Sequence, residues 1–288
     1  MNLSVVIIWF NPDTNSVFNI SKYASLVKTV YIVDNSENNN IHLATQISNS
    51  QYIGNLKNLG IAKATNIGCE QAFKDGFDWV MTMDQDSSWE ITELKKFINL
   101  IEKNEDNNII SFAPVHSNKI KSLVGDLKAK SNKTQNLQTI FQTKVMASGN
   151  IISLKVWKEV YGFNNDLFID EVDHEFCYKL IEAGYKICEF QDISMYHTLG
   201  NVKKTILPRP CKHSGVRLFY IFRNMLYIKD KFPNFFIENN YKKYMRNTII
   251  QKIFELKIKD LIFIYKGKKA HKYNIYGSYE NYYNRNKK

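Results

Sequence analysis

Two carboxylates separated by a single residue, Asp84 and Asp86, follow an apolar run that is typical of a buried strand. In an extended segment the side chains of residues i and i+2 point to the same side, so these two carboxylates would lie next to each other. Neighbouring carboxylates repel each other unless a cation lies between them. Hard oxygen ligands suit Mg²⁺ and Mn²⁺, which also bind diphosphate oxygens, so the pattern favours a divalent metal site over a solvated loop.

A second acidic cluster opens a helix that we expect within residues 168–183, and it consists of Asp170, Glu171, Asp173 and Glu175. Acidic residues in a first helical turn often only complement the helix dipole. Asp170 and Asp173, however, are three residues apart and would share one face of the helix. A carboxylate on that face could act as a general base toward a hydroxyl group.

Further side chains could contact a metal or a phosphate. His197 follows a predicted strand, where it could be a third metal ligand or a structural histidine. Arg217 and Arg223 lie in a helix-like stretch that continues to Asn224. A guanidinium binds phosphate oxygens in a bidentate way, but a basic surface face would show the same residues.

The elements that would position these side chains alternate between strands and helices. We expect strands at Leu3–Phe10, Val30–Val33, Gln51–Ile53, Asp78–Met83, Ile109–Val115, Lys144–Ile152 and Lys186–Tyr196, and helices at 14–27 and Ile61–Lys74. This order predicts an α/β fold with a mostly parallel central sheet flanked by helices. Ligands bind beyond the carboxyl ends of parallel strands, where Asn11, Asp34 and Asp84 would lie. The sequence has no GxGxxG and no GxxxxGK[ST], which disfavours dinucleotide oxidoreductases and P-loop phosphotransferases.

Charge is distributed unevenly along the 288 residues. Residues 1–200 hold 18 basic and 23 acidic residues, a net charge of −5, whereas residues 201–288 hold 21 basic and 5 acidic residues, a net charge of +16. A basic segment attracts phosphate-bearing partners such as nucleic acid, anionic lipid or a nucleotide diphosphate. We therefore expect a main domain at 1–205 and a basic, helical C-terminal region at 206–288.

Within the C-terminal region, Thr248–Lys266 predicts one helix with a wide apolar face and a narrow stripe of polar residues. Such a helix could lie on an anionic membrane surface, or it could pack on the main domain with its lysines outward. No apolar run approaches the ~20 residues that a membrane span needs.

Composition and cysteine usage bound the class of protein. Apolar residues make up 44% of the chain, enough for a packed core, which excludes a wholly disordered protein. The N-terminus has no basic segment or cleavage site typical of a secretory signal. The cysteines form no CxxC pair, so we expect free thiols in the cytoplasm. They are Cys69, Cys177, Cys188 and Cys211.

Taken together, these segments resemble bacterial family 2 glycosyltransferases with the GT-A fold, and among them the rhamnosyltransferase subgroup. The segments that carry the resemblance occur in the family's order. They are Val5–Pro12, Ile32–Asn35, Asn58–Ala62 with Asn66, Trp79–Ser87, Ser148–Gly149, Phe168–Cys177, His197–Gly200 and Tyr220–Asn224. The Asp-Gln-Asp-Ser form and the Phe-Ile-Asp-x-Val-Asp-x-Glu form are the most specific to the subgroup.

The resemblance implies roles for individual residues. Donor-binding residues would be Phe10, Asn11 and Asp34 around the base and ribose, Asn58 and Gly60 on the nucleotide side, and Asp84, Arg217, Arg223 and Asn224 at the diphosphate. Asp84 and Asp86, with His197 as a further ligand, would hold Mg²⁺ or Mn²⁺. Asp173 would be the base that deprotonates the acceptor hydroxyl, with Glu175 or Asp170 as its orienting partner, because Val172 stands where the family usually has a glutamate.

The resemblance also implies an activity. It is the inverting transfer of a sugar, rhamnose from dTDP-rhamnose, onto a saccharide acceptor that is lipid-linked, in the synthesis of a capsule, O-antigen or wall polysaccharide. The enzyme would then be cytoplasmic and peripheral on the inner face of the cell membrane, with its basic region on the anionic membrane surface.

Three other interpretations remain open at the level of sequence. The same fold and metal site could serve a UDP-hexose or galactofuranosyl donor. A sugar nucleotidyltransferase would carry a Gly-rich basic loop after the first strand, where this chain has Trp9-Phe-Asn-Pro12. A nucleic-acid-binding protein would use the basic region and need no metal, but it leaves the acidic strand ends without a purpose.

Overall fold

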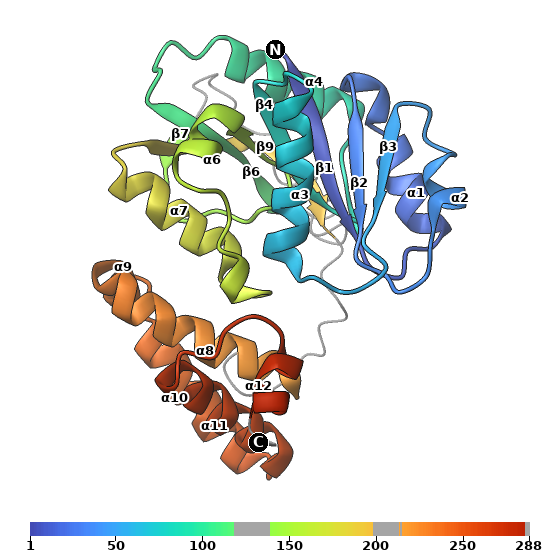
Figure 1. The fold of residues 1–288 in the computed structure, drawn as a ribbon. Coiled ribbons are helices and arrows are strands. Elements are labelled where there is room, and N and C mark those ends of the chain that lie inside the picture. Colours follow the sequence, from blue (N-terminus) through green and yellow to red (C-terminus); the bar gives the residue numbers. More distant parts are fainter. Residues whose placement is uncertain (118–138, 198–212, 214, 286–288) are drawn as a thin grey trace, which may run out of the picture.

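The computed structural model describes residues 1–117, 139–197, 213 and 215–285. Its centre is a sheet with strand order β3-β2-β1-β4-β8-β6-β9-β5, and β7 pairs with β9 (Figure 1). Strands β1 to β4 are mutually parallel, β8 is antiparallel to both of its neighbours, and β6 is parallel to β9. The bounds are β1 Leu3–Trp9, β2 Val30–Asp34, β3 Ser50–Gly54, β4 Trp79–Asp84, β5 Ser87–Ser88, β6 Ile109–Ser117, β7 Thr139–Phe141, β8 Asn150–Ser153 and β9 Lys186–His197.

Helices cover both faces of this sheet (Figure 1). The helices of the sheet domain are α1 Thr14–Ser21, α2 Ile41–Ala44, α3 Ile61–Lys74, α4 Ile91–Glu102, α6 Leu154–Glu159 and α7 Val172–Glu182, with 3₁₀ turns at Ala24–Leu26 and Asn165–Leu167. Alternate residues of β1 face opposite layers, as in any strand. Val5 and Ile7 pack with α1 and α4, while Val6 and Ile8 pack with α3, α6 and α7. The mostly parallel α/β sheet predicted from the sequence is confirmed.

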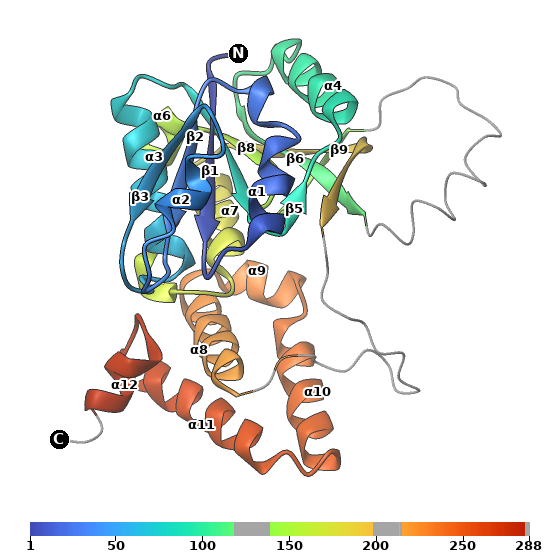
Figure 2. The ribbon, with the colours of Figure 1, turned by 90° about the vertical axis from the view of Figure 1, so that its right-hand side faces the viewer.

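The C-terminal region is a separate group of helices. It lies beyond the carboxyl ends of β1, β2 and β4 (Figures 1 and 2). The helices are α8 Val216–Lys231, α9 Pro233–Glu238, α10 Tyr241–Phe254, α11 Ile258–Lys272 and α12 Tyr279–Arg285. They have their own apolar core, which Tyr178 of α7 joins by stacking on Phe235 at 4.5 Å between ring centroids. The region is thus packed against the sheet domain through α7.

The prediction of a single helix at Thr248–Lys266 is wrong. The chain forms α10 and α11 instead, with a turn in which Leu256 has a φ of 53°. Lys252 and Asp260, both buried, join the two helices through an ion pair of 3.2 Å. A buried pair of this kind fixes the direction in which the second helix leaves the turn.

Two other expected ranges differ from the structure, and a third lies outside the described residues. The helix expected at 14–27 ends at Ser21 and is followed by a 3₁₀ turn. The strand expected from Lys144 begins only at Asn150, because residues 144–149 form a loop beside β4. The polar stretch at residues 119–136 predicts a loop, and all of it lies outside the described residues; the description resumes at β7. Across the described part of the chain, none of the helices combines the length and apolarity needed to cross a membrane.

Helices α8 and α11 approach each other closely at Gly267. A Cβ placed on this glycine would lie 2.4 Å from the carbonyl oxygen of Phe219 in α8. No real Cβ tolerates that distance, so α11 could accept a larger residue only by moving away from α8.

We therefore predict that Gly267→Ala lowers the free energy of unfolding by about 1–3 kcal/mol through overpacking. The melting temperature, followed by circular dichroism, should fall by about 2–4 °C for each kcal/mol. Lys272→Ala, at an exposed position of the same helix, is the matched control and should melt like the wild type. An unchanged melting temperature for Gly267→Ala would show that the two helices do not pack at this distance.

Candidate active site

Strand register brings several of the predicted residues to one edge of the sheet. Trp9 pairs with Asp34 of β2, and Ile8 pairs with Asp84 of β4. Phe10 and Asn11, which follow β1, therefore lie between the ends of β2 and β4. The carboxyl ends of three parallel strands meet here, as the strand order predicts.

The turn between β4 and β5 holds Asp84 and Asp86. Asp84 is half-buried and Asp86 is exposed. Gln85 between them turns toward β1, where its side-chain oxygen accepts a hydrogen bond from the Phe10 N–H at 2.8 Å and its amide donates to the Phe10 carbonyl at 3.3 Å. This pair of bonds fixes the turn without using either carboxylate.

His197 comes to the same turn through strand pairing. Ser87 of β5 pairs with His197 at the end of β9, so the backbone of the histidine lies one residue along from Asp86. Its side chain is not among those described. Among described residues, no group of three or more His, Cys, Asp and Glu side chains is arranged to hold a metal ion. Two carboxylates and an imidazole nevertheless form a donor set that suits Mg²⁺ or Mn²⁺, and the backbone brings all three residues together.

Asp173 lies beside the same turn, on the other side of a short loop at residues 147–149. The Ala147 N–H donates to one carboxylate oxygen of Asp173 at 3.3 Å, and the His174 N–H donates to the other at 3.0 Å. The next residue of the loop, Ser148, accepts a hydrogen bond from the Asp84 N–H at 3.1 Å through its hydroxyl. Consecutive residues of one loop thus contact the candidate base and the candidate metal turn.

This loop is held against β4 by further bonds. The Gly149 N–H donates to the Thr82 carbonyl at 2.7 Å, and the Ser148 hydroxyl donates to the Ser87 hydroxyl at 2.9 Å. Gly149 has a φ of 81°, and a Cβ there would lie 2.8 Å from the Met195 sulfur. These contacts explain the Ser-Gly motif. Ser148 makes hydrogen bonds with Asp84 of β4 and Ser87 of β5, and Gly149 has no room for a larger side chain.

Asp173 lies between two residues of a buried hydrogen-bond network, Glu171 and His174. Glu171 accepts hydrogen bonds from the His174 ring at 2.9 Å and from the Tyr241 hydroxyl of α10 at 2.5 Å. Burial alone would lower the pKa of His174, but the charges of Asp173 and Glu171 outweigh it and raise that pKa to about 9. The pKa of Glu171 is lowered, since His174 and Tyr241 outweigh the opposite effect of its burial. A cationic histidine therefore lies next to the candidate base at neutral pH.

Neither carboxylate expected to orient Asp173 makes a hydrogen bond with it among the described residues. Asp170 instead forms a bidentate ion pair with Arg217, with N–O distances of 2.6 and 2.7 Å. Glu175 lies 3.5 Å from the ammonium of Lys179. The orientation of Asp173 comes from two backbone N–H groups, which a pattern of side chains does not reveal.

Arg223 and Asn224 lie differently from the expectation that they contact the donor. Arg223 is fully buried, and its guanidinium donates to the carbonyls of Gly277, Asp166 and Leu167. The Asn224 amide donates to three carbonyls of the loop at 167–170. In this structure both side chains fasten that loop to α8 rather than reach a phosphate.

Asp34 is also placed differently from the expectation that it contacts the ribose. Its side chain is buried, and one carboxylate oxygen accepts from the N–H and hydroxyl of Ser36. The other oxygen accepts from Asn40 at 2.8 Å and from the Tyr52 hydroxyl at 2.9 Å. Asp34 thereby shapes the loop after β2.

The remaining residues predicted to bind the nucleotide-sugar donor lie along the open side of the same sheet edge. Phe10 is 49% exposed, and Asn11 and Asn58 are exposed as well. Gly60 is buried and has a φ of 84°, and its N–H donates a hydrogen bond to the side-chain oxygen of Asn58 at 2.9 Å. Its ideal Cβ would lie 2.6 Å from the Phe168 ring, so glycine is required for the loop at 166–171 to pack there.

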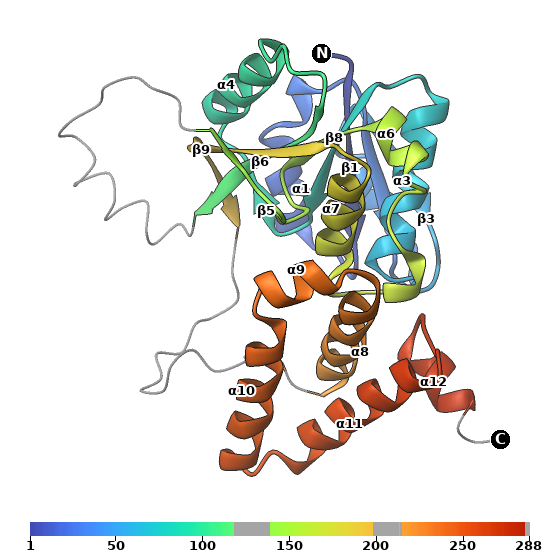
Figure 3. The ribbon, with the colours of Figure 1, turned by 90° about the vertical axis from the view of Figure 1, so that its left-hand side faces the viewer.

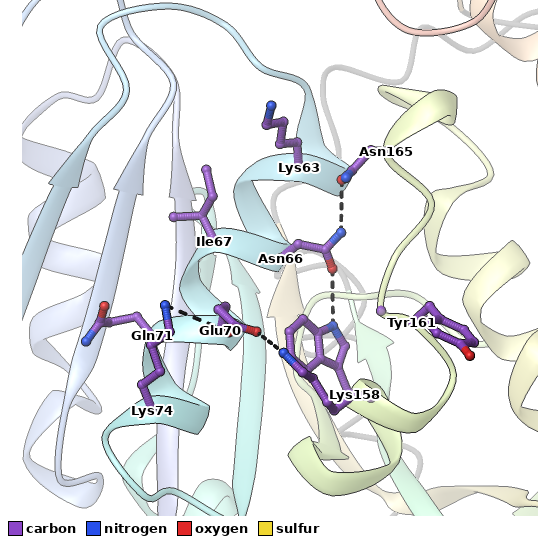
Figure 4. A pocket seen from close by; sticks show the side chains of 11 residues that line it. Lys63, Asn66, Ile67, Glu70, Gln71, Lys74, Lys158, Tyr161 and Asn165 are labelled. Atoms are coloured by element: carbon purple, nitrogen blue, oxygen red, sulfur yellow. Dashed lines mark hydrogen bonds and ion pairs between the residues drawn. The ribbon is translucent and has the colours of Figure 1, made fainter.

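One residue of the family pattern belongs to a different place. Asn66 of α3 lines a cavity of about 540 Å³ between α3 and α6 (Figure 4). Its side chain accepts from the Trp157 indole at 3.2 Å and the Phe163 N–H at 2.9 Å, and donates to Asn165 at 2.9 Å. Asn66 thus holds α3 against the segment that leads to α7. None of the predicted site residues lines this cavity.

The raised pKa of His174 predicts a dependence of stability on pH. The imidazolium is favoured in the folded state, so its stabilisation is fully present below pH 6.5 and is lost as the pH rises through about 9. We expect the difference in unfolding free energy between wild type and His174→Gln to shrink by about 2–3 kcal/mol over that range. Urea unfolding at a series of pH values measures it, with His42→Gln at an exposed position as the control. A difference that stays constant with pH would show that His174 is not held as a cation.

Comparison with known proteins shows which family the chain resembles. The family model described as Glycosyl transferase family 2 matches residues 14–156, about half of the chain. The dTDP-rhamnosyl transferase RfbF of Shigella flexneri is 29% identical over 239 residues, which cover 77% of this chain and 78% of that protein.

Two solved structures share the fold. The complex of S. aureus TarS 1–349 with UDP-GlcNAc aligns with a TM-score of 0.52 and 15% identity, over 80% of this chain and 67% of that chain. The complex of GalNAc-T7 with UDP, GalNAc and Mn²⁺ aligns with a TM-score of 0.51 and 14% identity, over 68% of this chain and 43% of that chain. The chain thus spans less than half the length of GalNAc-T7, and identities this low show the fold alone.

These findings confirm the resemblance in sequence and the GT-A fold. Residues 14–156 form a family 2 glycosyltransferase domain, and the chain is a nucleotide-sugar glycosyltransferase similar to a bacterial dTDP-rhamnosyl transferase.

Proposed function

We propose that this chain is a metal-dependent, inverting hexosyltransferase that moves rhamnose from dTDP-rhamnose onto a saccharide acceptor. The observation that carries the proposal is the loop at 147–149, which contacts Asp173 through Ala147 and Asp84 through Ser148. A base for the acceptor and a site for the donor diphosphate then lie on either side of one loop. The 29% identity to a dTDP-rhamnosyl transferase supports the choice of donor.

Asp84, Asp86 and His197 are the residues that would hold Mg²⁺ or Mn²⁺. When bound, the ion supplies positive charge that stabilises the departing nucleoside diphosphate. The Mn²⁺ named with GalNAc-T7 belongs to a protein of the same fold and is compatible with this choice. The chain's own contribution is to hold the two carboxylates on a short turn that Gln85 fixes to β1.

Asp173 would accept the proton of the acceptor hydroxyl. The oxygen forms a bond to the anomeric carbon as the bond from that carbon to the diphosphate breaks, the proton moves to Asp173, and the electron pair leaves with the diphosphate. This single in-line step inverts the anomeric configuration and needs no covalent intermediate on the enzyme. The N–H groups of Ala147 and His174 would hold the carboxylate in place for it.

Donor recognition would divide into two sets of residues. Phe10, Asn11 and Asn58 are exposed along the open edge and are suited to contact the nucleotide directly. The others would act through the loops they shape or the pairs they form: Asp34, Gly60, Arg217, Arg223 and Asn224.

The acceptor and the location form the remaining part of the proposal. A lipid-linked saccharide acceptor would bring the enzyme to the inner face of the cell membrane, and the net charge of +16 in residues 201–288 suits an anionic surface. The division into 1–205 and 206–288 is compatible with the separate apolar core of α8–α11. The product would extend a cell-surface polysaccharide.

A donor screen tests this function. The protein is incubated with Mg²⁺ or Mn²⁺, a lipid-linked acceptor and each of dTDP-rhamnose, UDP-hexoses and UDP-galactofuranose, and released nucleotide is measured. We expect turnover with dTDP-rhamnose that a chelator abolishes. Turnover with a UDP sugar instead would correct the donor, and release without metal would contradict the metal site.

Two substitutions separate the base from the metal site. Asp173→Asn should lower turnover by at least about 10²-fold, the contribution of a general base, while donor affinity stays near that of the wild type. Asp86→Ala should instead weaken donor binding in the presence of metal, measured by calorimetry.

For each substitution, a contrary result would rule out the role proposed for that residue. Loss of donor binding in Asp173→Asn would remove this residue from the base role. Unchanged metal dependence of donor binding in Asp86→Ala would remove that residue from the metal site. Glu90→Gln, an exposed carboxylate that follows the same turn, is the matched control and should behave like the wild type.

A further inference from the structure

The C-terminal helices enclose a cavity of about 470 Å³ with an unusual lining. Its cations are Lys229 of α8, Lys242 and Arg246 of α10, and Lys268 of α11, and its floor includes the apolar side chains of Phe236 and Met245. No acidic residue lines it. An apolar floor under a rim of cations is complementary to a molecule that joins phosphate to hydrocarbon.

The four cations are not neutralised within the described part of the chain. No carboxylate lies within ion-pair distance of any of them there. Lys268 lies over the face of the Phe222 ring, at 5.7 Å from its centroid. Four positive charges from three helices thus converge with no paired carboxylate in the part of the chain that the structure describes, although like charges repel each other. Such an arrangement attracts anions to this surface.

The turn from α10 to α11 continues this surface as an exposed apolar tip. Phe254 is 81% exposed, Leu256 83% and Ile258 67%. Ile250 both lines the cavity and is exposed, so the tip and the cavity are continuous. The buried Lys252–Asp260 pair holds the turn, which means that these apolar side chains are presented from a fixed backbone. Soluble proteins rarely expose contiguous apolar patches without a partner for them.

We infer that this face docks on a bilayer that contains anionic phospholipids. The apolar tip Phe254–Ile258 enters the boundary between headgroups and acyl chains, while Lys229, Lys242, Arg246 and Lys268 bind headgroup phosphates. The inference extends the membrane part of the proposed function and gives it a defined surface.

The position of the face fits that occupant. The turn lies at the far end of the helical region, on the side away from the sheet (Figures 2 and 3). The helical region itself lies beyond the carboxyl ends of β1, β2 and β4 (Figure 1). Asp84 ends β4, so docking would bring a lipid-borne acceptor to the side of the molecule at which that strand ends.

Charge and side-chain type disfavour two other occupants. A second copy of the same face would oppose four cations with four cations. Nucleic acid would match the cations, but Phe254 is the one aromatic side chain of the tip at residues 254–258, and Leu256 and Ile258 offer no flat face on which further bases could stack. Both remain measurable outcomes of the test.

The test measures binding of the full chain to sedimenting vesicles. We compare vesicles of phosphatidylcholine alone with vesicles that also contain phosphatidylglycerol, over a range of salt concentrations. We expect binding only to the anionic vesicles, weakening as salt rises. This measurement needs no donor or acceptor, so its result and that of the donor screen stand independently.

Two variants separate the contributions of the face. Phe254→Ser with Leu256→Ser should weaken binding at least about tenfold at every salt concentration, because the lost contacts are apolar. Lys242→Gln with Arg246→Gln should weaken it by about fivefold for each charge at low salt, and flatten its salt dependence. All four side chains are exposed or line an open cavity, and circular dichroism checks that both variants remain folded.

Matched controls lie on the sheet domain. Phe18→Ser removes an exposed apolar side chain from α1, and Lys95→Gln with Lys103→Gln removes two exposed charges in and after α4. Both controls should bind vesicles like the wild type.

Several results would overturn the inference. They are equal binding to neutral vesicles, unchanged binding in either variant of the face, and displacement by inorganic phosphate beyond that by chloride at equal ionic strength, which would indicate a soluble phosphate ligand. Tighter binding to single-stranded RNA through the same cations would assign the face to nucleic acid. A dimer that Phe254→Ser with Leu256→Ser dissociates would assign it to a second copy.

Discussion

The candidate site depends on one short loop that is hydrogen-bonded on both sides. Ala147 holds the carboxylate of Asp173, and Ser148 accepts from the backbone of Asp84, so the two acidic residues are fixed relative to each other by consecutive positions of the chain. Two carboxylates with different tasks must be close and yet not share a proton. A loop between them, with Gly149 allowing its tight turn, meets both requirements.

The loop at 166–171 links three helices near the candidate site: α3, α7 and α8. Arg223 and Asn224 of α8 hold its carbonyls, and Phe168 accepts a hydrogen bond from the Ile61 N–H at 2.6 Å, at the start of α3. The same loop leads into α7, which carries Asp173. The C-terminal helices therefore position both the candidate base and the start of α3, although they contribute no side chain to the candidate metal turn among the residues described. Glu171, bonded to Tyr241 of α10, adds a second connection of this kind.

The sequence predicts what is local and misses what depends on distant contacts. Apolar runs and turn residues located β1, β2, β4 and α3, whose bounds at Ile61–Lys74 match, and so located the Asp84 turn. The burial of Arg223 could not be predicted, because it depends on the Gly277 carbonyl 54 residues away. The break at Leu256 interrupts an apolar pattern that continues through it, and only the Lys252–Asp260 pair explains its direction. The sequence also could not show that Asp34 is occupied within the protein, because no sequence pattern marks its partners Asn40 and Tyr52.

In the site that we propose, a metal bound at Asp84 and Asp86 lies close to the carboxylate of Asp173. Nuclear magnetic resonance tests it most directly, by titrating Mn²⁺ into isotope-labelled protein in the presence of dTDP and following the paramagnetic broadening of assigned backbone amides. We expect the signals of Ala147, Ser148 and His174 to broaden together at the first equivalent of Mn²⁺. Broadening at the Asp84 turn that leaves His174 sharp, or broadening that begins elsewhere in the chain, would contradict it.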